Sequence, residues 1–256
     1  MSVLDHPLIS ERYFFPRPDA VAHPTWVDVE QGRLACFSSR KGHPLTVVQF
    51  HGNGEVVADY VPDFVELLEG LGADCFLAEY RGYGASTGVP QLGRMLDDVD
   101  AIFKAVGRRP EELIVYGRSV GSIFAVEFAH RYPEVAGLVV DSGIAVPLER
   151  ILLRASPEEL GTSLSALQAV CQQRLDHQAK LRQRRKPTLI LHAQHDSLVD
   201  VSHARRLASY PASNVRLVQF PRGDHNTCFA INRSQYVEEL RQLFSACTQG
   251  EMRYGP

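Results

Sequence analysis

The chain has 256 residues, 45% hydrophobic and 22% charged, so it can bury a sizeable core and is unlike a disordered, collagen-like or coiled-coil sequence. Its net charge of −3 provides no overall basic field, so we expect no nucleic-acid partner. Five scattered cysteines without CxxC spacing predict neither a disulfide framework nor a zinc site, and they favour a reducing compartment.

The amino-terminal residues lack the basic and apolar regions of a signal peptide. No stretch reaches the roughly 18 consecutive apolar residues that a membrane span needs. We therefore expect a cytoplasmic protein with no integral membrane span.

Two weak strand signals come first, over 25–29 and 34–37, and Gln31-Gly32 between them favours an antiparallel hairpin at a sheet edge. From residue 45 onward, short apolar runs alternate with helical patterns. The pattern predicts strands over 45–50, 73–78, 113–116, 137–140, 188–191 and 215–218, and helices over 55–70, 91–107 and up to about 132. Strands that are apolar throughout and separated by helices indicate an α/β fold with a mostly parallel central sheet, covered by helices on both faces.

Residues 144–186 differ from this alternation. They read as helical, with Leu164, Leu167, Cys171 and Leu175 on one stripe. We expect one domain over 1–256, with 144–186 as a small helical lid or insert. The apolar residues at 148 and 151–153 could bind an acyl group or form the insert's own contact with the domain.

A basic run over 180–186 ends the insert. The favoured interpretation is a solvated helix face near a helix C-terminus, where cations are stabilising. The alternative is contact with an anionic surface or a phosphate-bearing substrate.

Gly117-Arg118-Ser119-Val120-Gly121 is a GxSxG motif between a predicted strand and a predicted helix. In a nucleophile elbow the serine stands on a sharp turn that exposes its hydroxyl, and the glycines let neighbouring backbone approach closely. Ser86 and Ser142 lack glycines on both sides and are predicted to form turns. Ser119 is therefore the candidate nucleophile.

A serine hydroxyl needs a base to accept its proton and a carboxylate to orient that base. Asp196 follows the strand over 188–191, and His225 follows the last strand, so the chain supplies serine, acid and histidine in the order expected for this architecture. Three other aspartates compete for the acid role: Asp141, which also ends a strand, Asp200 and Asp224. The spacing favours Asp196, with Asp141 second.

Acyl transfer also needs hydrogen-bond donors for the oxyanion. The elbow offers the Val120 N–H, and the loop after the strand over 45–50 offers the Asn53 N–H, with Gly54 as the alternative. We expect His51 to form hydrogen bonds within this loop.

The motifs HGNGE at 51–55, EYRGYGASTGVP at 79–90, YGRSVGS at 116–122, HAQHDSLV at 192–199 and GDHN at 223–226 cover most of residues 45–226. On these motifs the chain resembles the α/β-hydrolases, and most closely their compact, short-lidded branch with protein depalmitoylases and uncharacterised bacterial hydrolases. The resemblance implies the α/β-hydrolase fold, a serine nucleophile, and no metal or organic cofactor.

Parts of the sequence also resemble a metal site and a dinucleotide-binding site. His192, His195 and His203 could be read as a metal cluster, but no HExxH pattern accompanies them. Gly52-Asn53-Gly54 with Glu79 imitates a dinucleotide fingerprint, but Val57 stands where a glycine or alanine would let helix and strand pack closely. The metal and dinucleotide interpretations are both disfavoured.

The sequence thus predicts a serine hydrolase of the esterase or thioesterase type, acting on a small-molecule or acyl substrate through an acyl-enzyme. A peptidase or acyltransferase with the same triad, or a binding protein without activity on this fold, is the alternative. The acyl chain, the leaving group and the oligomeric state do not follow from the residues.

Overall fold

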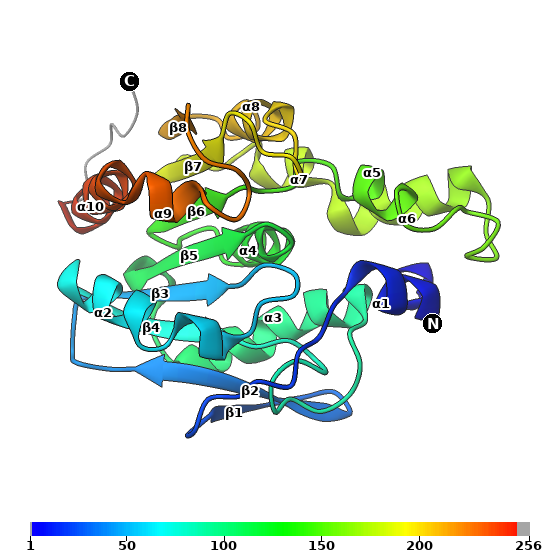
Figure 1. Ribbon diagram of the computed structural model, residues 1–256, viewed down its shortest axis with the longest axis horizontal. Coiled ribbons are helices and arrows are strands. Elements are labelled where there is room, and N and C mark those ends of the chain that lie inside the picture. Colours follow the sequence, from blue (N-terminus) through cyan, green and yellow to red (C-terminus); the bar gives the residue numbers. More distant parts are fainter. Residues whose placement is uncertain (1, 250–256) are drawn as a thin grey trace.

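The computed structural model describes residues 2–249, and an eight-stranded sheet with the order β1-β2-β4-β3-β5-β6-β7-β8 lies at its centre (Figure 1). The strands are β1 (Thr25–Val29), β2 (Gly32–Ser39), β3 (Leu45–Phe50), β4 (Ala73–Ala78), β5 (Leu113–Arg118), β6 (Gly137–Asp141), β7 (Thr188–Ala193) and β8 (Val215–Phe220). β3 to β8 are parallel, whereas β1 and β2 form an antiparallel hairpin and β2 is antiparallel to β4. The predicted mostly parallel sheet is confirmed.

Helices cover both faces of this sheet. On one face α3 (Leu92–Val106), α4 (Gly121–Arg131) and α8 (Ser202–Ala208) pack against it, and on the other face α2 (Asp63–Gly70) and α10 (Arg233–Gln249) do so. Successive side chains of β3 point to opposite faces of the sheet. Val48 packs toward α3 and α4, and Val47 packs toward α2 and α10. Every residue of β3, β4, β6 and β7 is buried, which explains why these strands are apolar on both sides.

The remaining helices lie at the ends of the sheet and in the insert, and all but α6 have seven residues or fewer. They are η1 (Val3–Asp5), α1 (Pro7–Tyr13), η2 (Val57–Tyr60), η3 (Pro110–Glu112), α5 (Pro147–Leu152), α6 (Leu164–Leu175), α7 (His177–Leu181) and α9 (Cys228–Ile231). Within residues 2–249, no helix is long and apolar enough to cross a membrane.

The helix predicted over 55–70 is two helices. η2 ends at Tyr60 and α2 begins at Asp63, with Pro62 between them. A proline lacks the backbone N–H that a continuous helix would need there, so the apolar spacing persists while the helix stops.

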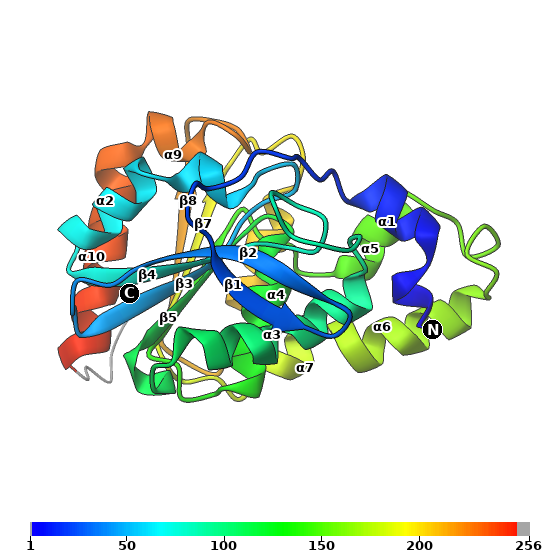
Figure 2. The same cartoon turned by 90° about the horizontal axis from the view of Figure 1, so that it is seen from below.

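The insert over 144–186 holds α5, α6 and α7 and lies beside α1 in both views (Figures 1 and 2). Arg12 of α1 donates to the Arg154 carbonyl at 3.2 Å and pairs with Glu159 at 2.9 Å. The predicted stripe is buried at Leu167 and Cys171 but exposed at Leu164. The sequence had given no indication that the first residues of the chain support the insert.

The basic run is solvated only in part: Arg182 and Arg185 are exposed, whereas Lys180 and Arg184 are held against the domain. α7 ends at Leu181, and the Lys180 Nζ forms an ion pair of 2.5 Å with Glu127, both side chains being 8% exposed. Arg184 is buried and donates to the Thr188 hydroxyl at 3.0 Å. Lys180 and Arg184 therefore fasten the end of the insert to the domain, and the prediction of solvation is wrong for both.

His177 is a buried histidine at the start of α7 that contacts the first residue of the insert. Its Nδ1–H donates to the Ile144 carbonyl at 2.9 Å, and its Nε2 has no hydrogen-bond partner within residues 2–249. A proton on Nε2 would therefore be buried without an acceptor. Burial, reinforced by the charge of Lys180, lowers the pKa of His177 to about 3.

This shift predicts a loss of stability in acid. Between the unfolded pKa of about 6.5 and the folded pKa of about 3, the unfolded chain binds a proton at His177 that the folded chain does not. The free energy of unfolding should therefore fall as the pH falls, by up to ~1.4 kcal/mol per pH unit from this group. In His177→Gln that contribution should vanish. Urea unfolding of both proteins at pH 7, 6 and 5 measures the difference, and parallel pH profiles would contradict it.

Candidate active site

Ser119 lies on the sharp turn between β5 and α4. Its φ is +51°, in the left-handed region, and its backbone N–H donates to the Asp141 carbonyl at 2.8 Å. A Cβ on Gly121 would lie 2.1 Å from the Phe50 carbonyl oxygen, and one on Gly117 would lie 2.6 Å from the Gly121 oxygen. Both glycines of the motif are thus required by close backbone contacts, as a nucleophile elbow demands.

The structure brings Ser119, His225 and Asp196 into one hydrogen-bonded chain. The Ser119 hydroxyl lies 3.0 Å from His225 Nε2, and His225 Nδ1 lies 2.7 Å from Asp196 Oδ2. The carboxylate can only accept, so Nδ1 carries a proton and Nε2 is free to accept the serine proton. This is the arrangement in which a histidine acts as a general base on a serine.

Asp196 is buried and held by its own loop. Its Oδ1 accepts hydrogen bonds from the backbone N–H groups of Leu198 at 2.9 Å and Val199 at 2.7 Å. Burial raises the pKa of Asp196, but the hydrogen bonds from His225 and the Val199 N–H outweigh burial, so the pKa is lowered overall. The carboxylate is therefore ionised at neutral pH.

The three rival aspartates have other contacts. Asp141 accepts from the Tyr116 hydroxyl at 3.0 Å, and Asp200 accepts from the Ser202 N–H at 2.9 Å. Asp224 binds the Ser197 N–H at 2.7 Å and the backbone N–H of His225 at 2.7 Å, which holds the acid and histidine loops together. Of the four, Asp196 is the one whose carboxylate contacts the His225 imidazole.

The loop after β3 is fixed through Asn53 and His51. The Asn53 side-chain oxygen accepts from the Phe15 N–H at 2.9 Å and the Tyr83 hydroxyl at 2.8 Å. His51 contacts the Gly52 carbonyl at 2.8 Å and Glu79 at 2.7 Å, as expected of a residue that supports the loop. Phe15 and Tyr83 were not identified from the sequence as partners of Asn53, because both lie far from it along the chain.

The backbone N–H groups of Asn53 and Val120 donate no hydrogen bond within residues 2–249. Asn53 lies in the loop after β3 and Val120 at the start of α4, and β3 and β5 are neighbours in the sheet. The two groups are thus free to bind a ligand oxygen, which is what an oxyanion hole requires.

In the metal and dinucleotide interpretations, His192, His203 and Glu79 were the candidate ligands, and in the structure each of them forms hydrogen bonds with the protein backbone. His192 Nε2 donates to the Val199 carbonyl at 2.7 Å, and His203 Nδ1 accepts from the Ala145 N–H at 3.1 Å, while His195 is exposed. Glu79 accepts from the Val57 N–H at 3.0 Å besides His51. No cluster of three potential metal-ligating side chains occurs in the part of the chain that the structure describes.

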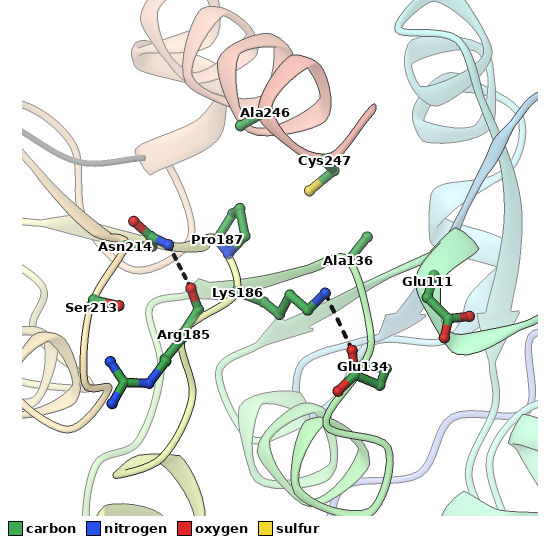
Figure 3. Close-up of a pocket in the computed structure, with 10 residues that line it drawn as sticks. All are labelled: Glu111, Glu134, Ala136, Arg185, Lys186, Pro187, Ser213, Asn214, Ala246 and Cys247. Atoms are coloured by element: carbon green, nitrogen blue, oxygen red, sulfur yellow. Dashed lines mark hydrogen bonds and ion pairs between the residues drawn. The ribbon is translucent and has the colours of Figure 1, made fainter. Parts of the chain in front are cut away.

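A cavity of about 500 Å³ lies at the amino ends of the parallel strands, away from their carboxyl ends (Figure 3). It is lined by Ala136, Pro187 and Asn214, which directly precede β6, β7 and β8, and by an ion pair of 3.3 Å between Lys186 and Glu134. The three triad residues follow the carboxyl ends of their strands, where ligands bind in parallel α/β sheets. This cavity is therefore not part of the Ser119 site.

The chain is similar to known hydrolases along most of its length. The family described as serine aminopeptidase, S33, matches residues 43–157. Human alpha/beta hydrolase domain-containing protein 17B is 28% identical over 219 residues, which are 83% of this chain and 71% of that protein.

Solved structures share the fold at lower identity. The Butyrivibrio proteoclasticus Est1E structure with ferulic acid has a TM-score of 0.73 at 16% identity and covers 88% of this chain and 99% of its own. Mouse alpha/beta hydrolase domain-containing protein 10 has a TM-score of 0.69 at 18% identity and covers 88% and 99%. The predicted α/β-hydrolase fold is confirmed, and the chain is similar in sequence to α/β-hydrolases over most of its length.

Proposed function

We propose that the protein is a serine hydrolase that cleaves a carboxylic ester or thioester through an acyl-enzyme intermediate. The hydrogen-bonded chain from the Ser119 hydroxyl through His225 to the buried Asp196 carries this proposal. A serine in the left-handed region at the end of a parallel strand, hydrogen-bonded to a histidine from a distant loop, has no evident structural purpose.

In the first half-reaction, the Ser119 oxygen attacks the acyl carbon while His225 Nε2 takes the hydroxyl proton. Asp196 holds the imidazole tautomer and stabilises the imidazolium that forms. The imidazolium then gives its proton to the leaving alcohol or thiol as the bond to the acyl carbon breaks. In the second half-reaction, a water molecule gives a proton to the same nitrogen and attacks the acyl carbon of the acyl-enzyme. The imidazolium then returns this proton to the Ser119 oxygen as its bond to the acyl carbon breaks, which releases the carboxylic acid.

The oxyanion would be bound by the N–H groups of Val120 and Asn53. Such donors are effective because they are fixed before the reaction and need no reorganisation as charge develops. The contacts of the Asn53 side chain with Phe15 and Tyr83 provide this fixation.

An aminopeptidase, as the matched family's description names, must also bind the substrate's α-ammonium group. Asp196 and Asp141 are buried, and their carboxylates are held by His225 and Tyr116. Neither could bind an ammonium group without losing these contacts, so neither supports an aminopeptidase's amino-terminal site.

Apolar side chains near the strand ends suit an acyl group. Phe15 is bonded through its N–H to Asn53 and is 46% exposed, and Leu198, two residues after Asp196, is 52% exposed. In the insert, Ile151 is buried in the core while Leu153 is 68% exposed. The insert's apolar residues thus divide between contact with the domain and exposure.

A fluorophosphonate probe with intact-protein mass spectrometry tests the proposal. The wild-type protein should take one adduct per chain, and Ser119→Ala should take none. Ser165→Ala, which removes an exposed serine of α6, is the matched control and should take one adduct. A parallel panel of p-nitrophenyl esters, acyl thioesters and aminoacyl anilides should give turnover of the first two classes. A folded wild-type protein without an adduct, or an adduct retained in Ser119→Ala, would contradict the proposal.

A further inference from the structure

Arg118 directly precedes Ser119, and its side chain is only 14% exposed. Its Nη1 forms an ion pair with Glu55. Its Nη2 donates to the His225 carbonyl at 2.8 Å and to the Asn226 side-chain oxygen at 3.2 Å. One guanidinium therefore contacts the loop after β3 and the loop after β8 while its backbone belongs to the elbow.

Glu55 is itself fixed to the loop that carries Asn53. Its Oε2 accepts from the Gly52 N–H at 2.6 Å and from the Tyr60 hydroxyl at 2.6 Å. A Cβ on Gly52 would lie 2.7 Å from Arg118 Nη1 and 2.8 Å from Glu55 Oε2, so the ion pair packs directly against the backbone of this loop. The position of Arg118 is thus coupled to the residue next to Asn53.

The loop after β8, which carries His225, must span three strand spacings to reach Ser119. β8 lies three positions from β5 in the sheet, which at about 4.8 Å per strand is ~14 Å. The loop after β8 must cross this distance to place His225 next to Ser119. Asp196 holds the imidazole from the acid loop, and the hydrogen bond from Arg118 holds the backbone of the same residue from the elbow.

We propose that Arg118 and Glu55 form a positioning pair that sets the nucleophile elbow, the oxyanion loop and the histidine loop relative to one another. The pair touches no reacting atom. It acts through the Gly52 backbone on the donor at Asn53, and through the His225 carbonyl on the distance between the imidazole and Ser119. This inference rests on the proposed serine-hydrolase function.

The residue types suit this role. A guanidinium is a planar fork with five N–H donors, so it can serve a carboxylate and a carbonyl at the same time. A lysine ammonium at position 118 can neutralise Glu55 but cannot keep the same fixed geometry toward the His225 carbonyl. Glu55 accepts from Arg118 with Oε1 and from Gly52 with Oε2, whereas a glutamine at position 55 would present an NH₂ donor to one of these two donors.

The rate of fluorophosphonate inactivation, resolved into its limiting rate and its half-saturating probe concentration, tests the proposal. Arg118→Gln and Glu55→Gln should each lower the limiting rate ~10- to 100-fold, because displaced groups lose their alignment. The half-saturating concentration should change less than about threefold, since the probe's binding contacts are retained. Arg118→Lys should fall between the wild type and Arg118→Gln. The double variant should lie within about threefold of the slower single variant, because coupled residues are not additive.

Arg131→Gln is the matched control. Arg131 lies on α4, is 23% exposed and pairs with Glu127 and Asp100, both away from the triad. Its limiting rate should equal that of the wild type. Glu55→Gln and Arg118→Lys keep the test decisive if Arg118→Gln does not fold, and thermal melting establishes which variants are folded.

The outcomes separate the two proposals. A wild-type protein that takes no adduct would overturn the hydrolase function and this inference with it. Normal wild-type labelling, with folded Arg118 and Glu55 variants that react at the wild-type limiting rate, would overturn the inference alone. The inference would also fail if the variants lost only probe affinity, or if Arg131→Gln lost as much as Arg118→Gln.

Discussion

Ser119→Ala should lower kcat/KM for any ester or thioester that the wild-type protein hydrolyses by at least ~10³-fold. Without the hydroxyl no acyl-enzyme can form, and only catalysis by the oxyanion donors and substrate binding remains. The fold should survive, because within residues 2–249 the serine hydroxyl is hydrogen-bonded only to His225, and alanine tolerates the turn's φ of +51° as well as serine does. Steady-state kinetics and thermal melting of the same preparations measure both effects.

The control for this substitution is Ser165→Ala, which should retain full activity and the wild-type melting temperature. A folded Ser119→Ala protein with kcat/KM close to that of the wild type would remove Ser119 from the mechanism. The hydrolysis would then have to come from a different residue or from a contaminant.

Asp196→Asn should lower kcat by about 10²- to 10⁴-fold. An asparagine that turns its amide NH₂ toward His225 Nδ1 would favour the tautomer with the proton on Nε2, which cannot accept from Ser119. It would also leave the imidazolium without a compensating charge. Since the pKa of Asp196 is lowered, the wild-type carboxylate is ionised at neutral pH, so the loss of kcat measured there by steady-state kinetics reports the substitution and not a titration of Asp196.

Asp141→Asn is the matched comparison, because Asp141 is also buried and is the last residue of the neighbouring parallel strand, β6. Its carboxylate contacts Tyr116 instead of the imidazole, so we expect a much smaller loss. If Asp141→Asn proved more damaging than Asp196→Asn, the acid assignment would be wrong. The lowered pKa also implies that the stabilisation from ionised Asp196 is complete above the unfolded pKa of about 3.8 and is lost as the pH falls through the folded value.

The sheet and the elbow could be predicted because their determinants are local. Runs such as Val47-Val48 are apolar on both sides, and in the structure they pack into the two separate halves of the core. GxSxG placed between a strand and a helix predicted the turn at Ser119, since only glycine tolerates the backbone contacts at Gly117 and Gly121. Pro62 was visible too, but the apolar spacing on either side of it suggested one helix where the structure has two.

The fold class, the strand ends at which polar residues gather, and the order of serine, acid and histidine could be predicted from the residues, because each depends on short segments and on the geometry of parallel sheets. Which aspartate reaches His225, and what anchors Asn53, is visible only once the chain is folded. The same holds for the link from Arg118 to Glu55 and the His225 loop. These contacts join residues that are 29 to 107 positions apart, and their geometry depends on how β3, β5, β7 and β8 are ordered in the sheet. A pattern of local periodicity holds no information on such distances, whereas packing fixes them.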